Sequence, residues 1–399
     1  MQFIMSPLTV SLPPAPFVFD PACLYARLHT LTDGRDPRGV RYPLAALLTI
    51  ATLAKLAGQN QIRDIAQWAQ LRAPLLADCF ALHRPTMPHH TTWSRVFGGA
   101  IDPTAFSLFV ADFLTVTAAP RVRGQRTRRR GTIALCLDGK TLRGTIPAGK
   151  TRGGHLLAAY LPGEGVTLLE VAVAGKENEI ITAKQVIAAI DVHGMVVTGD
   201  AMFTQRELSR QVRRGGGDYL WCVKENQEEM YAAIATLFTT PPVPAAPDDF
   251  THATSADTAH GRYEERHLTA SSLLTGYLDW PSAQQVFRVE RCTRLSDGTQ
   301  RKSVAYGVTS VPPKIADAAR LLALVRGHWG VENGLFHRRD VTLGEDRGLL
   351  RRGNGPQVMA SVNDLVLGLM ARKGHTNVAQ ARRIYAAFPD HALALLTSA

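Results

Sequence analysis

The sequence predicts an α/β protein with a mixed β-sheet and helices on both of its faces. An all-α N-terminal domain precedes this unit, and a β-rich insertion interrupts it. Three observations predict this arrangement. Residues 21–118 show only helical periodicity; residues 132–239 alternate strand-like and helical patterns in the order β-β-β-α-β-α-β-α; and residues 240–312 form several strand-like runs after a proline-rich exit.

Length and charge limit the class of protein. The chain has 399 residues, enough for two or three domains, and its 45% apolar and 20% charged residues are ordinary globular usage. The net charge of +11 favours a polyanionic partner such as nucleic acid. Nine of the 45 basic residues are lysine and 36 are arginine, whose planar fork suits phosphate, although a GC-rich genome would also give this ratio.

Cysteine spacing and hydropathy argue against a secreted or membrane protein. The five cysteines show no paired spacing, which fits a reducing cytoplasm. The N-terminus lacks the basic region of a secretory signal. The longest apolar run, PLAALLTIATLAKLAG, is broken by Lys55 and is shorter than the roughly 20 residues that span a bilayer. We therefore expect a cytoplasmic protein with no membrane partner.

The N-terminal part divides into a tail and a helical domain. Residues 1–20 are proline-rich and are expected to be mobile. Residues 21–118 contain short amphipathic segments punctuated by Pro, Asn, Asp and Gly. One of them, TTWSRVF, is a candidate helix-turn-helix element, and a plain helical bundle is the alternative. The side chains that would face DNA are Thr91, Thr92, Ser94 and Arg95.

A basic linker, residues 119–131, follows the helical domain. Its arginine-rich run RVRGQRTRRR contains no acid, so it repels itself and stays extended. The same run would also suit contacts with a phosphate backbone, whereas a solvated linker is the alternative. The arginines concerned are Arg121, Arg123, Arg126, Arg128, Arg129 and Arg130.

Five strands and three helices are expected within residues 132–239. TIALCLD reads as a buried strand ending at Asp138, followed by the short antiparallel neighbours HLLAAYLP and VTLLEVAVAG. MVVTGD and DYLWCVKEN are the fourth and fifth strands, and the fourth ends at Asp200. The helix TQRELSRQVRR between them has Thr204 as its expected N-cap and stops at a run of glycines.

The insertion, residues 240–312, reads as strands GRYEERHLTA, QVFRVERCTRL and RKSVAYGVTS, with a turn at Ser296-Asp297-Gly298 between the last two. Trp280 is a candidate for stacking on a flipped base or, as the commoner case, a buried packing residue. Residues 313–375 return to helical periodicity and are expected to complete the core. Residues 376–399 are expected to form a C-terminal tail.

Two acidic residues each end a predicted buried strand. If the first and fourth strands are adjacent and parallel, Asp138 and Asp200 emerge at the same carboxyl edge of the sheet, where ligands of open α/β sheets collect. Two close carboxylates repel each other unless a divalent cation holds them together. In the alternative, Asp200 caps the next helix and Asp138 caps the turn at Gly139.

A third carboxylate is expected from the helical segment after the insertion, where the candidates are Glu332, Asp340, Glu345 and Asp346. His328 and Glu332 are spaced four residues apart and share a helix face with Arg339. Such a stripe suits a phosphodiester site, because the carboxylate holds metal while cations hold phosphates; a surface salt-bridge ladder is the alternative. Further cations expected near the same sheet edge, on phosphate or in solvent, are Lys140, Arg143 and Lys224.

Five segments resemble, in order, the motifs of bacterial insertion-sequence DDE transposases, in the subgroup that includes the H-repeat-associated proteins. They are LDGKTLRGT, KENEIITA, VVTGDAMFTQ, DYLWCVKENQ and VRGHWGVENGLFHRRDVTLGED. The resemblance covers residues 21 to about 370, and the shared order makes it specific although each motif is short. It implies a ribonuclease H-like catalytic core, which agrees with the strand order read from the residues.

The resemblance also implies a catalytic triad, Asp138, Asp200 and Glu332, that binds two Mg²⁺ ions, with Mn²⁺ as a substitute. The related signature Tyr-x2-Arg-x3-Glu-x6-Lys falls on Val325, His328, Glu332 and Arg339, of which only the glutamate matches. His328 and Arg339 are expected to keep a positive charge for phosphate.

The activity implied is cutting and joining of the element's ends by two-metal phosphoryl transfer. The expected partner is double-stranded DNA, both terminal inverted repeats and target, bound by a homodimer. The expected location is the bacterial cytoplasm, in association with the nucleoid.

Two rival functions remain open at this stage. A nuclease of the same fold, such as a junction resolvase, would cut DNA without joining it, but the insertion and the helical domain exceed what a minimal nuclease needs. A non-enzymatic DNA-binding protein descended from a transposase is the second rival. The intact Asp138, Asp200 and Glu332 argue only weakly against it.

Overall fold

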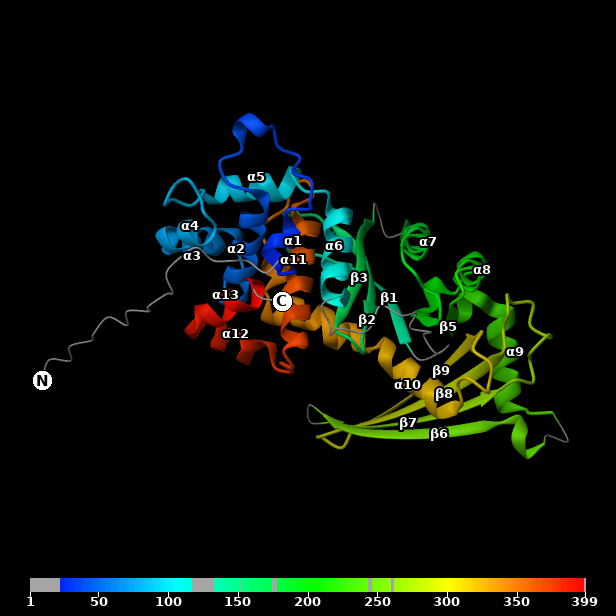
Figure 1. Cartoon of the computed structure of the whole chain (residues 1–399). Helices are drawn as coiled ribbons and strands as arrows, with labels where there is room; N and C mark the ends of the chain where they lie inside the picture. The colour runs from blue at the N-terminus through cyan, green and yellow to red at the C-terminus, as the bar shows by residue number, and fades with distance from the viewer. Residues whose placement is uncertain are drawn as a thin grey trace, which may run out of the picture.

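The computed structural model describes residues 22–116, 133–151, 153–173, 178–242, 246–259 and 262–397. The expected mobile N-terminus, residues 1–20, and the basic linker, residues 119–131, lie outside the described residues. Figure 1 shows a group of helices at one end of the molecule and a long sheet that extends away from it.

The sheet has nine strands in the order β3-β2-β1-β4-β5-β9-β8-β7-β6. β1 and β4 are parallel, β4 and β5 are parallel, and the other neighbours are antiparallel. The expected adjacent, parallel placement of the first and fourth strands is therefore found. The strands are β1 Ile133–Thr141, β2 His155–Leu161, β3 Val166–Val173, β4 Met195–Gly199, β5 Asp218–Val223, β6 Thr251–Ala259, β7 Arg262–Ser271, β8 Gln285–Leu295 and β9 Gln300–Thr309.

The β-rich segment continues the core sheet instead of forming a sheet of its own. β9 pairs with β5 through four residues, from Leu220 opposite Thr309 to Val223 opposite Tyr306. β6, whose sequence THATSADTA is largely polar, lies at the outer edge and pairs with β7. This strand was not expected, because its side chains are too polar to give a strand signal.

Alternating side chains on the central strands divide the core between two layers of helices. Val197 and Trp221 pack against α7, α8 and α9, whereas Val196 and Leu220 pack on the opposite face against α10. Trp280 is 8% exposed and belongs to the first of these cores, so it packs and does not present its ring to a ligand. The helices are α7 Glu179–Ala189, α8 Arg206–Arg214, α9 Glu228–Thr239 and α10 Ala318–His328. The N-cap of α8 is Gln205, one residue after the expected Thr204.

The N-terminal helices share one hydrophobic core with the C-terminal helices. In Figure 1, α11 runs through the middle of the N-terminal group, and α12 and α13 lie beside it. The segment expected as a C-terminal tail thus consists largely of two packed helices. The elements are α1 Leu24–Leu28, α2 Leu44–Leu56, α3 Ile62–Gln70, α4 Ala73–Cys79, α5 His90–Gly99, α6 Pro103–Val116, α11 Gly355–Arg372, α12 Val378–Ala387 and α13 Pro389–Thr397.

Within the described residues, no single helix is long and apolar enough to cross a membrane. The pair α5 and α6 meets the length and composition criteria only when taken together, with a bend of 92° between the two helices.

Candidate catalytic site

Asp138 and Asp200 lie at the same level of two neighbouring parallel strands. The last paired residues of β1 and β4 are Cys136 and Thr198, and each aspartate follows two residues later. Neighbouring strands lie about 4.8 Å apart, so this register brings both carboxylates to one edge of the sheet. β4 ends at Gly199, whereas β1 continues against β2 as far as Thr141, three residues beyond the expected strand end.

Each aspartate accepts a local hydrogen bond. Oδ1 of Asp138 accepts from the Gly139 amide at 2.8 Å, and Oδ1 of Asp200 accepts from the Met202 amide at 3.0 Å. Asp200 therefore caps the short helix η4, Ala201–Phe203, as the capping alternative expected. A cap occupies one oxygen of a carboxylate, so capping and ligand binding are compatible.

Burial raises the pKa of Asp138 to about 7. The hydrogen bond from Gly139 opposes this rise, and the negative charges of Asp200, Glu332 and Glu179 add to it. Several acidic groups therefore lie near Asp138 at the strand end. A bound cation would reduce the repulsion between their negative charges.

Two contacts at the end of α10 bring Glu332 toward these strands. The Cys136 thiol donates to the carbonyl of Gly327 at 3.5 Å, and a hydrogen bond of 3.1 Å joins Thr198 Oγ1 to His328 Nδ1. Both contacts use the last paired residues of β1 and β4. Four residues after His328, Glu332 opens a π-helical turn, η7 Glu332–Phe336, an irregularity that is frequent at functional sites.

The chemistry of this group suits a hard cation. Asp138, Asp200 and Glu332 offer only carboxylate oxygens, which are the ligands that Mg²⁺ and Mn²⁺ prefer. Among the residues that the structure describes, no three His, Cys, Asp or Glu side chains are gathered closely enough to hold one metal ion. The donor type and the strand register fit a divalent cation, and the side chains would have to draw together around it.

Arg339, expected at the DNA, is an internal residue with no exposed surface. It lies in a second π-helical turn, η8 Arg338–Thr342, and contacts Glu170 of β3, Glu345 of the 3-10 turn η9 Glu345–Arg347, and Asp364 of α11. A guanidinium enclosed by three acids cannot reach DNA phosphate. The expected phosphate contact of Arg339 is therefore wrong for this fold.

Lys140 is likewise turned inward. Its ammonium contacts Asp340 and lies 2.9 Å from Oε2 of Glu345, and the side chain is 6% exposed. These contacts show that two of the other candidates for a third carboxylate, Asp340 and Glu345, are engaged in ion pairs. Asp340 and Glu345 neutralise buried cations, whereas Asp346 lies 3.8 Å from the guanidinium of Arg143.

His328 cannot carry the expected positive charge at neutral pH. Burial lowers its pKa to about 4, and the negative charge of Asp200 opposes this shift only in part. The neutral ring serves instead to dock α10 on β4 through Thr198.

Three of the other expected DNA-facing cations are exposed. The Arg143 side chain is 78% exposed, and Lys224 and Arg95 are also exposed. Thr91 shares the exposed face of α5 with Arg95, while Trp93 and Phe97 are buried beneath them. The six linker arginines lie outside the described residues.

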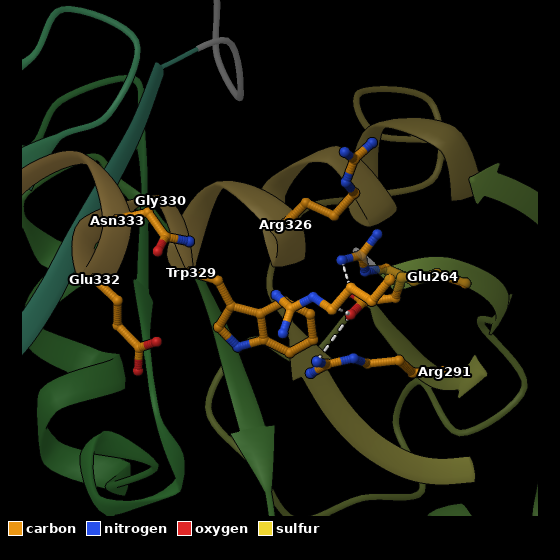
Figure 2. Close-up of a pocket in the computed structure, with 9 residues that line it drawn as sticks. Glu264, Arg291, Arg326, Trp329, Gly330, Glu332 and Asn333 are labelled. Atoms are coloured by element: carbon orange, nitrogen blue, oxygen red, sulfur yellow. Dashed lines mark hydrogen bonds and ion pairs between the residues drawn. The ribbon is translucent and has the colours of Figure 1, made fainter. Parts of the chain in front are cut away.

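An arginine-lined pocket of about 250 Å³ adjoins Glu332 and was not expected from the sequence. Figure 2 shows Trp329 between the Glu332 side chain and this basic cluster. Arg291 lies 4.9 Å from the centre of the Trp329 ring, and its guanidinium is 2.9 Å from buried Glu264. The arginines that line the pocket are Arg262, Arg266, Arg291 and Arg326.

Sequence reasoning missed these arginines because they come from three elements, β7, β8 and α10, that only the fold brings together. It also missed Glu179, which is 2% exposed and influences Asp138. Glu179 stands inside the motif KENEIITA, so its motif was noticed but no role was assigned to the residue. Glu345 is a candidate metal ligand by sequence, whereas the structure pairs it with Lys140 and Arg339.

Family models identify the class of protein. A model described as "Transposase DDE domain" matches residues 129–361, more than half of the chain. A second model, described as "DDE_Tnp_1-associated", matches residues 25–114. The chain belongs to the bacterial insertion-sequence DDE transposases, as the motifs indicated.

Several of its relatives are named as putative transposases. The chain is 26% identical to "Putative transposase YncI" of Escherichia coli O157:H7, with 86% of each chain covered. It is 24% identical to "H repeat-associated putative transposase YhhI" of Escherichia coli K12, covering 87% of this chain and 90% of that one. A piggyBac transposase in a synaptic complex with hairpin DNA aligns at a TM-score of 0.42 and 10% identity, over 94% of this chain and 78% of that chain.

Proposed function

We propose that this transposase cuts the ends of an insertion sequence and joins them to target DNA, with Asp138, Asp200 and Glu332 as its catalytic carboxylates. The observation that carries the proposal is the equal level of Asp138 and Asp200 at the edge of β1 and β4. The strand order β3-β2-β1-β4-β5, with helices on both faces, supports a ribonuclease H-like core.

The three carboxylates would hold two Mg²⁺ ions, with Mn²⁺ as a substitute. When bound, such a pair activates the attacking hydroxyl and stabilises the leaving oxygen of a phosphodiester. The protein's part is to place the carboxylates at one sheet edge and to dock Glu332 beside them through His328 and Thr198.

The reaction proceeds in two transfers at the same site. Water attacks the phosphodiester at the element's end and leaves a 3′-hydroxyl on the DNA. That hydroxyl then attacks a target phosphodiester, forming the new bond as the target's own 3′ oxygen leaves. No protein residue forms a covalent bond with DNA in this scheme.

Basic side chains around the edge would hold the two DNA partners, the terminal inverted repeats and the target. Lys224 and Arg143 are exposed near the strand ends, and the arginine pocket lies beside Glu332. Because two ends must meet before joining, we propose that the DNA-bound form is a homodimer, acting at the bacterial nucleoid.

The proposal is tested with duplex DNA that carries the terminal sequences flanking the gene, incubated with the full chain and Mg²⁺. Cleavage and strand transfer are both expected for the natural protein. Asp200→Asn and Glu332→Gln should each lower cleavage at least a thousandfold while DNA affinity is kept. Asp248→Asn, at an exposed aspartate just before β6, the outermost strand of the sheet, is the matched control and should cleave normally.

Pre-cut ends separate the two rival functions. A protein that cleaves ends but does not join pre-cut ends to target would be a nuclease. One that binds ends tightly and does neither would be a DNA-binding derivative. Normal cleavage by Asp200→Asn would remove the triad from the proposal.

A further inference from the structure

A buried histidine–glutamate pair lies directly beneath the strand that carries Asp138. Nε2 of His155 is 2.9 Å from Oε1 of Glu179, and the two side chains are 13% and 3% exposed. Glu179 is the first residue of α7, and His155 is the first residue of β2. Neither residue has a role in the catalytic scheme described above.

The pair packs against the backbone of Gly139, the residue after Asp138. A Cβ atom placed on Gly139 would be 2.6 Å from Oε2 of Glu179 and 2.7 Å from Nε2 of His155. Contacts this close leave no room for a side chain. Because Gly139 has no side chain, the backbone of β1 can pack closely against His155 and Glu179. A displacement of either side chain would therefore displace the Asp138–Gly139 peptide.

The pair is itself held on both sides. Nδ1 of His155 is joined to Thr141 Oγ1 by a hydrogen bond of 2.9 Å, and Thr141 lies opposite His155 in the β1–β2 ladder. On the other side, α7 packs on β2 and β3 and also contacts η4, the turn that Asp200 caps. The pair thus lies between the strand of Asp138 and the helix that contacts the turn after Asp200.

We propose that Glu179 and His155 are positioning residues that fix the Asp138–Gly139 peptide, and through it the Asp138 carboxylate, in the orientation that binds a divalent cation. This inference rests on the proposed function. The Gly139 amide is the link, because it donates to Oδ1 of Asp138 and so sets the rotation of the carboxyl group. Partners that orient ligands in this way commonly change metal affinity 10- to 100-fold when removed.

A purely structural role is a weaker account of the pair. A buried polar contact is poor evidence for stability, since replacing both partners with apolar groups of the same shape can be nearly neutral or stabilising. The negative charge of Glu179 also acts on Asp138, where it adds to those of Asp200 and Glu332. Glu179 therefore affects the proposed metal ligand, Asp138, both through packing and through its charge.

The test is a Mn²⁺ titration of the full chain without DNA. The electron paramagnetic resonance signal of free Mn²⁺ reports how much of the ion remains unbound. Glu179→Gln should weaken Mn²⁺ binding about 10- to 100-fold. The matched control is Glu164→Gln, which changes an exposed glutamate in the turn between β2 and β3 and should leave the affinity unchanged. Cleavage by Glu179→Gln should recover at saturating Mn²⁺, whereas cleavage by Asp138→Asn should not.

His155→Gln provides the second variant and should weaken Mn²⁺ binding by a similar factor. If the pair acts as a unit, the double variant His155→Gln/Glu179→Gln loses little more affinity than either single variant. If circular dichroism shows that Glu179→Gln does not fold, His155→Gln alone decides the matter.

The outcomes separate this inference from the proposed function. Absence of Mn²⁺ binding by the natural protein would count against the metal-dependent function itself. Mn²⁺ binding by the natural protein with unchanged affinity in the folded variants would overturn only the positioning role.

Discussion

Nη1 of Arg339 lies 2.7 Å from Oε1 of Glu170, and neither side chain has any exposed surface. The same guanidinium contacts Glu345 and Asp364. Burial raises the pKa values of Glu170 and Asp364, and the positive charge of Arg339 opposes both shifts. Three acids in the core therefore contact one cation, and Glu345 is paired with Lys140 as well.

Arg339→Met should reduce the free energy of unfolding by about 3–5 kcal/mol, because it leaves buried acidic groups without their partner. Urea denaturation followed by circular dichroism measures the change. Arg347→Met, at an exposed arginine of η9, is the matched control and should lie within about 0.5 kcal/mol of the natural protein. Equal stability of the two variants would show that the network contributes nothing to the fold.

Lys140 and Lys224 should differ in their effect on DNA binding, because Lys140 is paired inside the protein and Lys224 is exposed. Lys224→Met should flatten the dependence of log affinity on log salt concentration by about 0.9, the value for one lost phosphate contact. Lys140→Met should leave this slope unchanged and lower the stability. Fluorescence anisotropy at several salt concentrations gives the slopes, and a reduced slope for a folded Lys140→Met would contradict the internal assignment.

His328 should make stability depend on pH. Its pKa is lowered from 6.5 to about 4 in the folded chain, so the unfolded chain binds the proton more tightly. Stability is therefore fully present above pH 6.5 and is lost as the pH falls toward 4, by about 2 kcal/mol between pH 7 and pH 5. The comparison is the natural protein against His328→Gln at both pH values, since other titrating groups are common to both. The same pH dependence in the two proteins would refute the assignment.

The linker should contribute affinity for DNA of any sequence, and α5 should contribute the preference for the element's own ends. Replacement of the six linker arginines with Gln should weaken binding to all sequences alike and flatten the salt slope, since phosphate contacts carry no sequence information. Arg95→Ala should mainly reduce the preference for the element's own ends. Competition binding with matched and scrambled ends measures both effects; a linker variant that loses only its preference would reverse the assignment.

The order of strands and helices along the core could be predicted from the sequence, because each element has a recognisable local pattern of apolar residues. Asp138 and Asp200 follow short, mostly apolar runs, and buried parallel strands have that composition. The order of the motifs then selected Glu332 among four acidic candidates. The assignment of the three carboxylates to catalysis remains a prediction.

The sequence did not predict which basic side chains would be buried and which would be exposed. Arg339 and Lys140 carry the same charge as Arg143 and Lys224, and local sequence does not say which of them the fold will enclose. Arg339 is enclosed because Glu170 and Asp364, 169 and 25 residues away in the chain, converge on it. Long-range pairing of this kind leaves no periodic signal.

The shared core of the N-terminal and C-terminal helices has a consequence for synthesis. The last turn of α6 ends at Val116, and its packing partner α11 begins only at Gly355. At about 5–20 residues per second, the ribosome delivers that partner some tens of seconds later, and it delivers Arg382, which bonds to Asn60 and to the backbone of Lys55, later still. Helices α1 to α6 must therefore wait, with apolar faces exposed, until α11 and Arg382 have been translated.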